Sequence, residues 1–138
     1  MKNFLSILLA TLLGLPLLAQ TISLNEGWQF SQKGKDTWYD AEVPGSVQRD
    51  LIRHGVLPDP YYGTNEEKVQ WPEMEDWDFR KTFNITEDQL KSDDAFLFFE
   101  GLDTHADVFL NGSRILQTQN MFVGHRVSVK NSLLEGEN

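Results

Sequence analysis

Residues 106–116 read ADVFLNGSRIL and contain the clearest structural pattern in the chain. Ala106, Val108 and Leu110 recur at every second position, which is the period of a β-strand with one buried face. Asn111-Gly112 follows directly, and this dipeptide favours the tight turn between antiparallel strands because both residues accept positive φ. Residues 113–116 then return as the second strand. The segment therefore predicts a β-hairpin.

Similar patterns on both sides of the hairpin predict further strands. Apolar residues alternate with polar ones around residues 28–30 and 77–83, and residues 38–43 form a short extended piece before a Pro-Gly pair. Residues 95–99 (AFLFF) are apolar without interruption, which favours a central strand buried on both faces. The other positions that we expect in strands are Ile22, Leu24, Val123, Val127 and Val129, with Gly124 at a candidate bulge.

One convincing helix is expected after residue 45. Ser46 can cap it through its hydroxyl, and Val47 and Leu51 fall on one face. Gly55 can supply the left-handed exit. Asp50 lies away from the Val47–Leu51 face, so we expect it at the surface. A helix of about two turns needs packing to hold it in place.

About seven short strands, one short helix and no βαβ spacing predict an all-β fold, an antiparallel β-sandwich of the jelly-roll type. Residues 131–138 (NSLLEGEN) read as a polar turn that delivers the chain into another strand. A sandwich that stopped there would keep an unpaired strand edge. We therefore expect a jelly roll truncated at its C-terminal strands, at the front end of a longer protein.

Composition excludes several classes of function. The 138 residues include 12 Lys+Arg against 21 Asp+Glu, a net charge of −9. This balance disfavours a nucleic acid or an anionic membrane as partner, since both are bound by clustered cations. The chain has no Cys, which removes thiol catalysis, disulfides and Cys-ligated metals. We expect no cofactor.

Residues 1–20 (MKNFLSILLATLLGLPLLAQ) have the pattern of a secretory signal peptide. A basic start, a short apolar stretch and a small residue at position 19 fit cleavage after Ala19. A membrane anchor fits less well, because Pro16 interrupts an apolar run that is already short for a span. We expect export to a bacterial periplasm or the exterior, and residues 20–138 as the mature domain.

Acidic residues cluster around residues 66–78, but their spacing selects no facing carboxylate pair of the kind used in glycoside hydrolysis. We expect no catalytic residue there. Asp103, His105 and Asp107 would share one strand face and are suitable metal ligands. Because no second ligand cluster accompanies them, we interpret them as the polar outer face of a strand and expect no metal site.

Residues 57–72 (LPDPYYGTNEEKVQWP) predict a long irregular loop, and such loops are usually functional. Tyr61, Tyr62 and Trp71 lie in it, and Trp77 follows. Sugar rings stack their apolar faces on aromatic rings, while amides and carboxylates bind their hydroxyls. Closure of the sandwich explains these aromatics equally well, and we favour that interpretation for Trp77.

The segments WYDAEVPGSVQRDLIRHGVLPDPYYGTNEEKVQWPEMEDWDFRKTF and FFEGLDTHADVFLNG resemble the N-terminal domain of glycoside hydrolase family 2, and within it most of all the β-mannosidases. The resemblance rests on Val43-Pro44-Gly45, on residues 59–66 and on Trp77 with Phe79-Arg80, and it extends to residues 120–122. It implies a galactose-binding-like jelly roll, an immunoglobulin-like domain and a catalytic barrel downstream, and a retaining mechanism.

The resemblance also implies where a sugar would bind. Sugar-contacting asparagines of related β-galactosidases lie in the loop that Asn65 matches, so Asn65 is the best candidate for substrate binding, and its neighbours Asp59, Glu66 and Trp71 follow. Both catalytic glutamates of the family lie in the barrel, so this chain alone should be inactive. The expected substrate is a terminal β-mannoside; a β-galactosidase, a β-glucuronidase or a free-standing carbohydrate-binding module remains an alternative.

Overall fold

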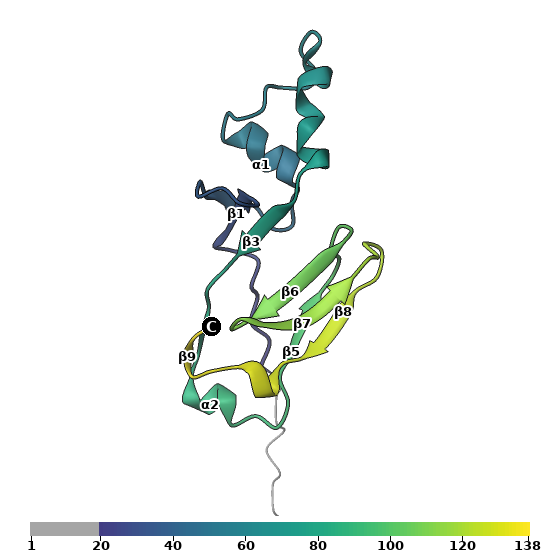
Figure 1. Cartoon of the computed structure of the whole chain (residues 1–138). Coiled ribbons are helices and arrows are strands. Elements are labelled where there is room, and N and C mark those ends of the chain that lie inside the picture. The colour runs from purple at the N-terminus through teal and green to yellow at the C-terminus, as the bar shows by residue number, and fades with distance from the viewer. Residues whose placement is uncertain (1–19) are drawn as a thin grey trace, which may run out of the picture.

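The computed structural model describes residues 20–138. The proposed signal peptide lies outside the described residues. Residues 20–138 form nine strands, all paired antiparallel, with two short α-helices and three 3-10 helices. Figure 1 shows them as two lobes, an upper one around β1, β3 and α1 and a lower one around β5 to β8. No helix among these residues is long and apolar enough to cross a membrane.

The upper lobe is a three-stranded sheet covered by a helix. β1 (Trp28–Gln32) lies between β2 (Tyr39–Ala41) and β3 (Trp77–Arg80). Phe30 is opposite Tyr39 on one side and Phe79 on the other, and it is fully buried. It packs with Leu51 of α1 (Val47–Arg53) and with Leu57 to form the lobe's core.

The helix α1 has the expected cap but one unexpected burial. The Ser46 hydroxyl accepts a hydrogen bond from Arg49 N, and Gly55 has a φ of +70°. The expectation that Asp50 lies at the surface is wrong: the residue is 1% exposed. Its carboxylate faces back toward the chain before the helix, where it accepts hydrogen bonds from Glu42 N at 3.2 and 3.1 Å.

The predicted hairpin forms in the lower lobe. β6 (Ala106–Leu110) pairs with β7 (Ser113–Thr118), and the turn residues Asn111 and Gly112 have φ values of +50° and +79°. The Asn111 amide also donates to Ser132 O at 2.8 Å and so ties the turn to the C-terminal segment.

A second ladder of the lower lobe differs from expectation. β5 (Phe96–Phe99) pairs only with β8 (His125–Ser128) among the described strands. Residues 95–99 were expected to be buried on both faces, but Phe96 and Phe98 are exposed. The prediction is wrong for residues 20–138 because these side chains stay accessible on a two-stranded ladder, where the Arg126 guanidinium lies over the Phe96 ring at 3.7 Å.

Short elements complete the lower lobe. β4 (Asn84–Ile85) pairs with β9 (Gly136–Glu137), and η3 (Lys130–Ser132) precedes β9. A capping box of Thr86 and Gln89 starts α2 (Glu87–Leu90). The expected strand at residues 22–24 is absent from the described chain, which is irregular until β1 begins.

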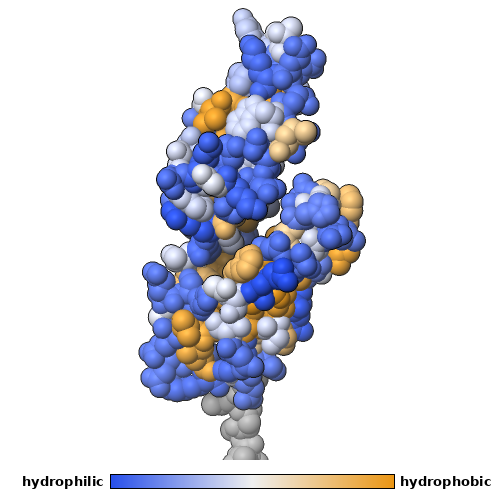
Figure 2. All heavy atoms as spheres, in the orientation of Figure 1, coloured by the Kyte–Doolittle hydropathy of each residue, from blue (hydrophilic) through white to orange (hydrophobic). Residues whose placement is uncertain are grey.

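The two lobes enclose an open space. It measures about 2920 Å³ and is lined by residues of both lobes, including Trp28, Phe79, Phe98 and Phe109. Figure 2 shows apolar side chains gathered along the indentation between the lobes. The inner faces of the sheets are therefore only partly covered by residues 20–138.

Candidate functional site

The expected irregular loop after Leu57 is partly helical. Two 3-10 helices follow one another, η1 (Asn65–Val69) and η2 (Trp71–Met74). Pro72 lies at the start of η2, where a missing N–H costs nothing and the fixed φ suits a helix. Figure 1 shows the two helices leading from the tip of the upper lobe down to β3. Asn65 is the first residue of η1 and Trp71 is the first residue of η2.

Asp59 and Asn65 close the loop between them. The Asn65 amide donates to Asp59 O at 3.0 Å, and the Asp59 carboxylate accepts from Tyr61 N at 2.9 Å. The Lys68 ammonium donates to the Asn65 side-chain oxygen at 3.0 Å. Both ends of the Asn65 amide are thus engaged within the loop, so its role in this structure is to fix the conformation of residues 59–65.

The loop closed in this way presents two tyrosines to the outside. Tyr61 is 96% exposed and Tyr62 is 79% exposed. A buried aromatic would contribute to the core, but these two rings contribute nothing to it. Exposed aromatic rings on a conformationally fixed loop are suited to contact with a sugar or with another protein surface.

Glu66 lies beside Asn65 on η1 and is exposed. Its backbone carbonyl accepts from the Gln70 amide at 2.9 Å. Its carboxylate receives no hydrogen bond from residues 20–138. The structure therefore brings Asp59, Asn65 and Glu66 together on one loop.

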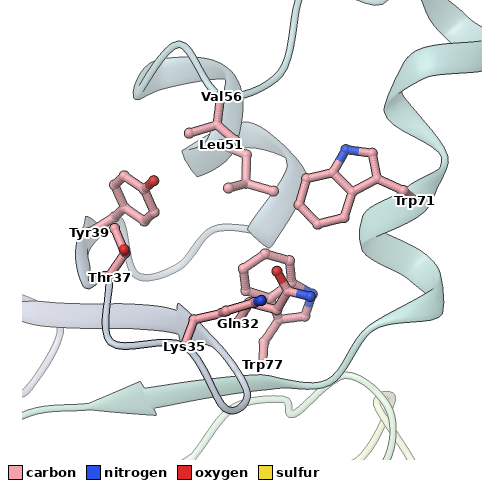
Figure 3. A pocket seen from close by; sticks show the side chains of 8 residues that line it. All are labelled: Gln32, Lys35, Thr37, Tyr39, Leu51, Val56, Trp71 and Trp77. Atoms are coloured by element: carbon pink, nitrogen blue, oxygen red, sulfur yellow. The ribbon is translucent and has the colours of Figure 1, made fainter.

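Trp71 occupies a different place, in a cavity of about 180 Å³. Figure 3 shows its ring pointing toward α1, with Trp77 below it. The two ring centroids are 5.9 Å apart at an interplanar angle of 40°. Trp77 also packs against Phe30, so it takes part in closing the core, as favoured from the sequence, and in lining this cavity. The lining residues are Gln32, Lys35, Thr37, Tyr39, Leu51, Val56, Trp71 and Trp77.

Sequence reasoning missed the polar lining of this cavity. Gln32 is the last residue of β1, and Lys35 and Thr37 lie in the β1–β2 connection, some 35 residues before Trp71. Only the antiparallel pairing of β1 with β3 brings these segments together. The alternation of Trp77 and Phe79 indicated the strand, but no local pattern indicated its partner.

Asp103, His105 and Asp107 are exposed, whereas Ala106 and Val108 between them are half-buried. Asp107 pairs with Arg114 across the hairpin at 3.3 Å. No group of three His, Asp or Glu residues suited to hold a metal occurs within residues 20–138. Asp107 lies on β6, whereas Asp103 and His105 precede that strand, so the expected polar strand face is present only at Asp107.

The sequence model of the family described as glycosyl hydrolase 2 galactose-binding domain-like matches residues 28–138. The chain belongs to this family. The antiparallel, mostly β architecture expected for a galactose-binding-like domain is thus confirmed, with more helical turns than the single helix expected.

Similar proteins include several β-mannosidases. Beta-mannosidase B of Emericella nidulans is 40% identical over 119 residues, which cover 83% of this chain and 14% of that protein. The crystal structure of a β-D-mannosidase from Dictyoglomus thermophilum is 44% identical, with a TM-score of 0.82 over 85% of this chain and 14% of that chain. An exo-chitosanase of Amycolatopsis orientalis, 21% identical with a TM-score of 0.72, shares the fold. The galactose-binding-like domain therefore spans about one seventh of the β-mannosidases that it matches.

Proposed function

We propose that this chain is the N-terminal domain of an exported β-mannosidase that removes terminal β-linked mannose from oligosaccharides. The observation that carries the proposal is the match to a β-D-mannosidase structure at 44% identity and a TM-score of 0.82. A fungal β-mannosidase at 40% identity supports the same substrate. The lower similarity to the exo-chitosanase supports only the fold.

In this proposal the domain contributes to substrate binding, and a fused catalytic domain carries out hydrolysis. Retaining glycosidases need two carboxyl groups about 5 Å apart on either side of the scissile bond. No acidic residue of η1, η2 or β3 lines the cavity of about 180 Å³ beside Trp71. The loop of Asp59, Asn65 and Glu66 is the part of the domain best suited to face the non-reducing end of the substrate.

The open space between the lobes supports a fused partner. Phe79, Phe98 and Phe109 are exposed on sheets of only two or three strands. Burial of such side chains contributes about 1.5–3 kcal/mol each, so segments of the same polypeptide that cover them would stabilise β3 of the upper lobe and the sheets of the lower lobe. The relatives extend far beyond the 14% of their length that this chain matches, and their further segments are the candidates for this cover.

Export rests on residues 1–19 and is part of the proposal. Secretion in a bacterial host, followed by N-terminal sequencing of the secreted protein, tests it directly. A mature protein that starts at Gln20 is expected, and a cell-retained protein that starts at Met1 would contradict export while leaving the enzymatic proposal intact.

The enzymatic proposal is tested with the full-length polypeptide and three aryl glycosides of matched leaving group. The β-mannoside should be hydrolysed fastest. Preference for the β-galactoside or the β-glucuronide would contradict the proposal and identify the protein as a β-galactosidase or a β-glucuronidase instead. Residues 20–138 alone should hydrolyse none of the three.

The role of the loop is tested in the same enzyme with Asn65→Ala. Loss of one hydrogen bond to a sugar hydroxyl, or of the loop conformation that positions it, should lower kcat/KM about 5- to 30-fold, corresponding to roughly 1–2 kcal/mol. Asn25→Ala is the matched control, because Asn25 is exposed and lies outside the loop. Equal kinetics for both variants would show that the domain only buttresses the catalytic domain.

A further inference from the structure

We propose that the cavity between the β1–β2 connection, α1 and η2 is a second carbohydrate subsite. It binds a single pyranose ring and is separate from the loop of Asp59 and Asn65. The inference rests on the proposed function for its ligand class, and on the cavity's own geometry for its place. Of the four residues predicted to bind substrate, only Trp71 lines this cavity.

Two indole rings provide the apolar wall. Trp71 is 37% exposed, although its ring lies 5.9 Å from that of Trp77. The two rings are tilted by 40° to one another, and both line the cavity. The C–H faces of a pyranose are apolar and pack on such rings, as ligands do on the aromatic walls of binding pockets.

Four polar side chains also line the cavity. Figure 3 shows the Lys35 ammonium and the Gln32 amide near Trp77, and Thr37 near the base of the Tyr39 ring, with the Tyr39 hydroxyl at the far end of that ring. None of these four side chains makes a hydrogen bond to another residue within 20–138. They offer an ammonium, an amide and two hydroxyls to a ligand, which together donate to and accept from the hydroxyls of a sugar.

Size and rigidity limit what the cavity can bind. Its volume of about 180 Å³ is smaller than the roughly 300–1,000 Å³ of pockets for drug-sized ligands, so it holds one ring and leaves any further units in solvent. Leu51 is buried beside it in the core. The Trp77 indole is held by its hydrogen bond to Pro72 O at 3.0 Å, so little ordering is needed on binding.

A photoaffinity experiment on the full-length polypeptide tests this subsite. The probe is a mannopyranoside carrying a diazirine, and labelled peptides are mapped by mass spectrometry. Labelling is expected in residues 32–39 and 71–77, and Trp71→Ala and Lys35→Ala should each reduce it about 5-fold or more, the effect of losing roughly 1 kcal/mol of binding. Excess mannobiose should compete with the probe.

Lys33→Ala is the matched control. Lys33 lies in the same connection and carries the same charge, but it pairs with Asp76 at 3.2 Å and does not line the cavity. Labelling of the Lys33→Ala variant should stay within 2-fold of the labelling of the unsubstituted protein. Trp71→Phe keeps an aromatic ring at this position and therefore controls for misfolding of Trp71→Ala. It should retain more labelling than Trp71→Ala.

Two outcomes overturn the subsite: no labelling of the cavity peptides, or an equal loss in Lys33→Ala and Lys35→Ala. Hydrolysis of an aryl β-mannoside by the same preparation separates this result from the proposed function. Hydrolysis without cavity labelling refutes the subsite alone, and cavity labelling without hydrolysis refutes the β-mannosidase proposal alone.

Discussion

Asp50→Ala should loosen the segment that joins β2 to α1. The buried carboxylate accepts from Glu42 N with both oxygens and from the Arg53 guanidinium at 2.8 Å. Hydrogen bonds to a charged group are worth about 1.5–3 kcal/mol each. Arg53 is half-exposed, so water can replace the carboxylate as its hydrogen-bond acceptor in the variant. The Glu42 N–H instead loses the acceptor that it has in this structure. We therefore expect a local loss of about 2–3 kcal/mol.

Hydrogen–deuterium exchange of the full-length polypeptide measures this loss locally. At 1.4 kcal/mol per factor of ten, amides of residues 42–54 should exchange about 30- to 150-fold faster in Asp50→Ala. Amides of β6 and β7 should be unaffected and serve as the internal reference. Arg49→Ala is the control, since its ion pair with Glu42 at 3.8 Å is exposed and worth little. Equal exchange in both variants would refute the clamping role of Asp50.

Three further substitutions test the fold, each measured by the same exchange method. Phe30→Ala empties the core between Tyr39 and Trp77 and should cost about 3–5 kcal/mol in the upper lobe, whereas the exposed Phe122→Ala should cost under about 0.5 kcal/mol. Thr86→Ala removes the cap of α2 and should cost about 1 kcal/mol at the α2 amides; unchanged exchange there would contradict the cap. Gly112→Ala places a side chain at a φ of +79° and should cost about 1 kcal/mol in the β6–β7 hairpin, with equal protection as the contradicting result.

Local sequence patterns predicted the secondary-structure elements well, but they predicted the burial of individual side chains less well. The hairpin at Asn111-Gly112 and the cap at Ser46 follow from turn and cap chemistry within a few residues, and the structure has both. Asp50 was misplaced because helical position alone put it away from the Val47–Leu51 face. Its burial depends on Glu42, whose N–H turns toward the helix, and no helical periodicity carries that information.

The candidate site divides in the same way. Asp59 and Asn65 are six residues apart, so their contact lies within the reach of one loop, and the sequence named both. Lys35 and Trp71 line the same cavity because β1 pairs with β3, which brings distant segments together. Loop residues with recognisable chemistry can thus be found from the sequence, whereas the polar lining of the cavity needs the register of the sheet.

The two lobes differ in how much they depend on further chain. The buried core of Phe30, Leu51 and Leu57 comes entirely from the upper lobe and lies directly beneath the cavity of Trp71. In the lower lobe, Phe98 and Phe109 stay exposed on two-stranded sheets. Segments that cover the lower sheets would therefore protect the amides of β5 and β8 strongly and those of α1 little. The loop and the cavity owe their geometry to local packing, and the lower lobe is the part whose stability a fused domain would decide.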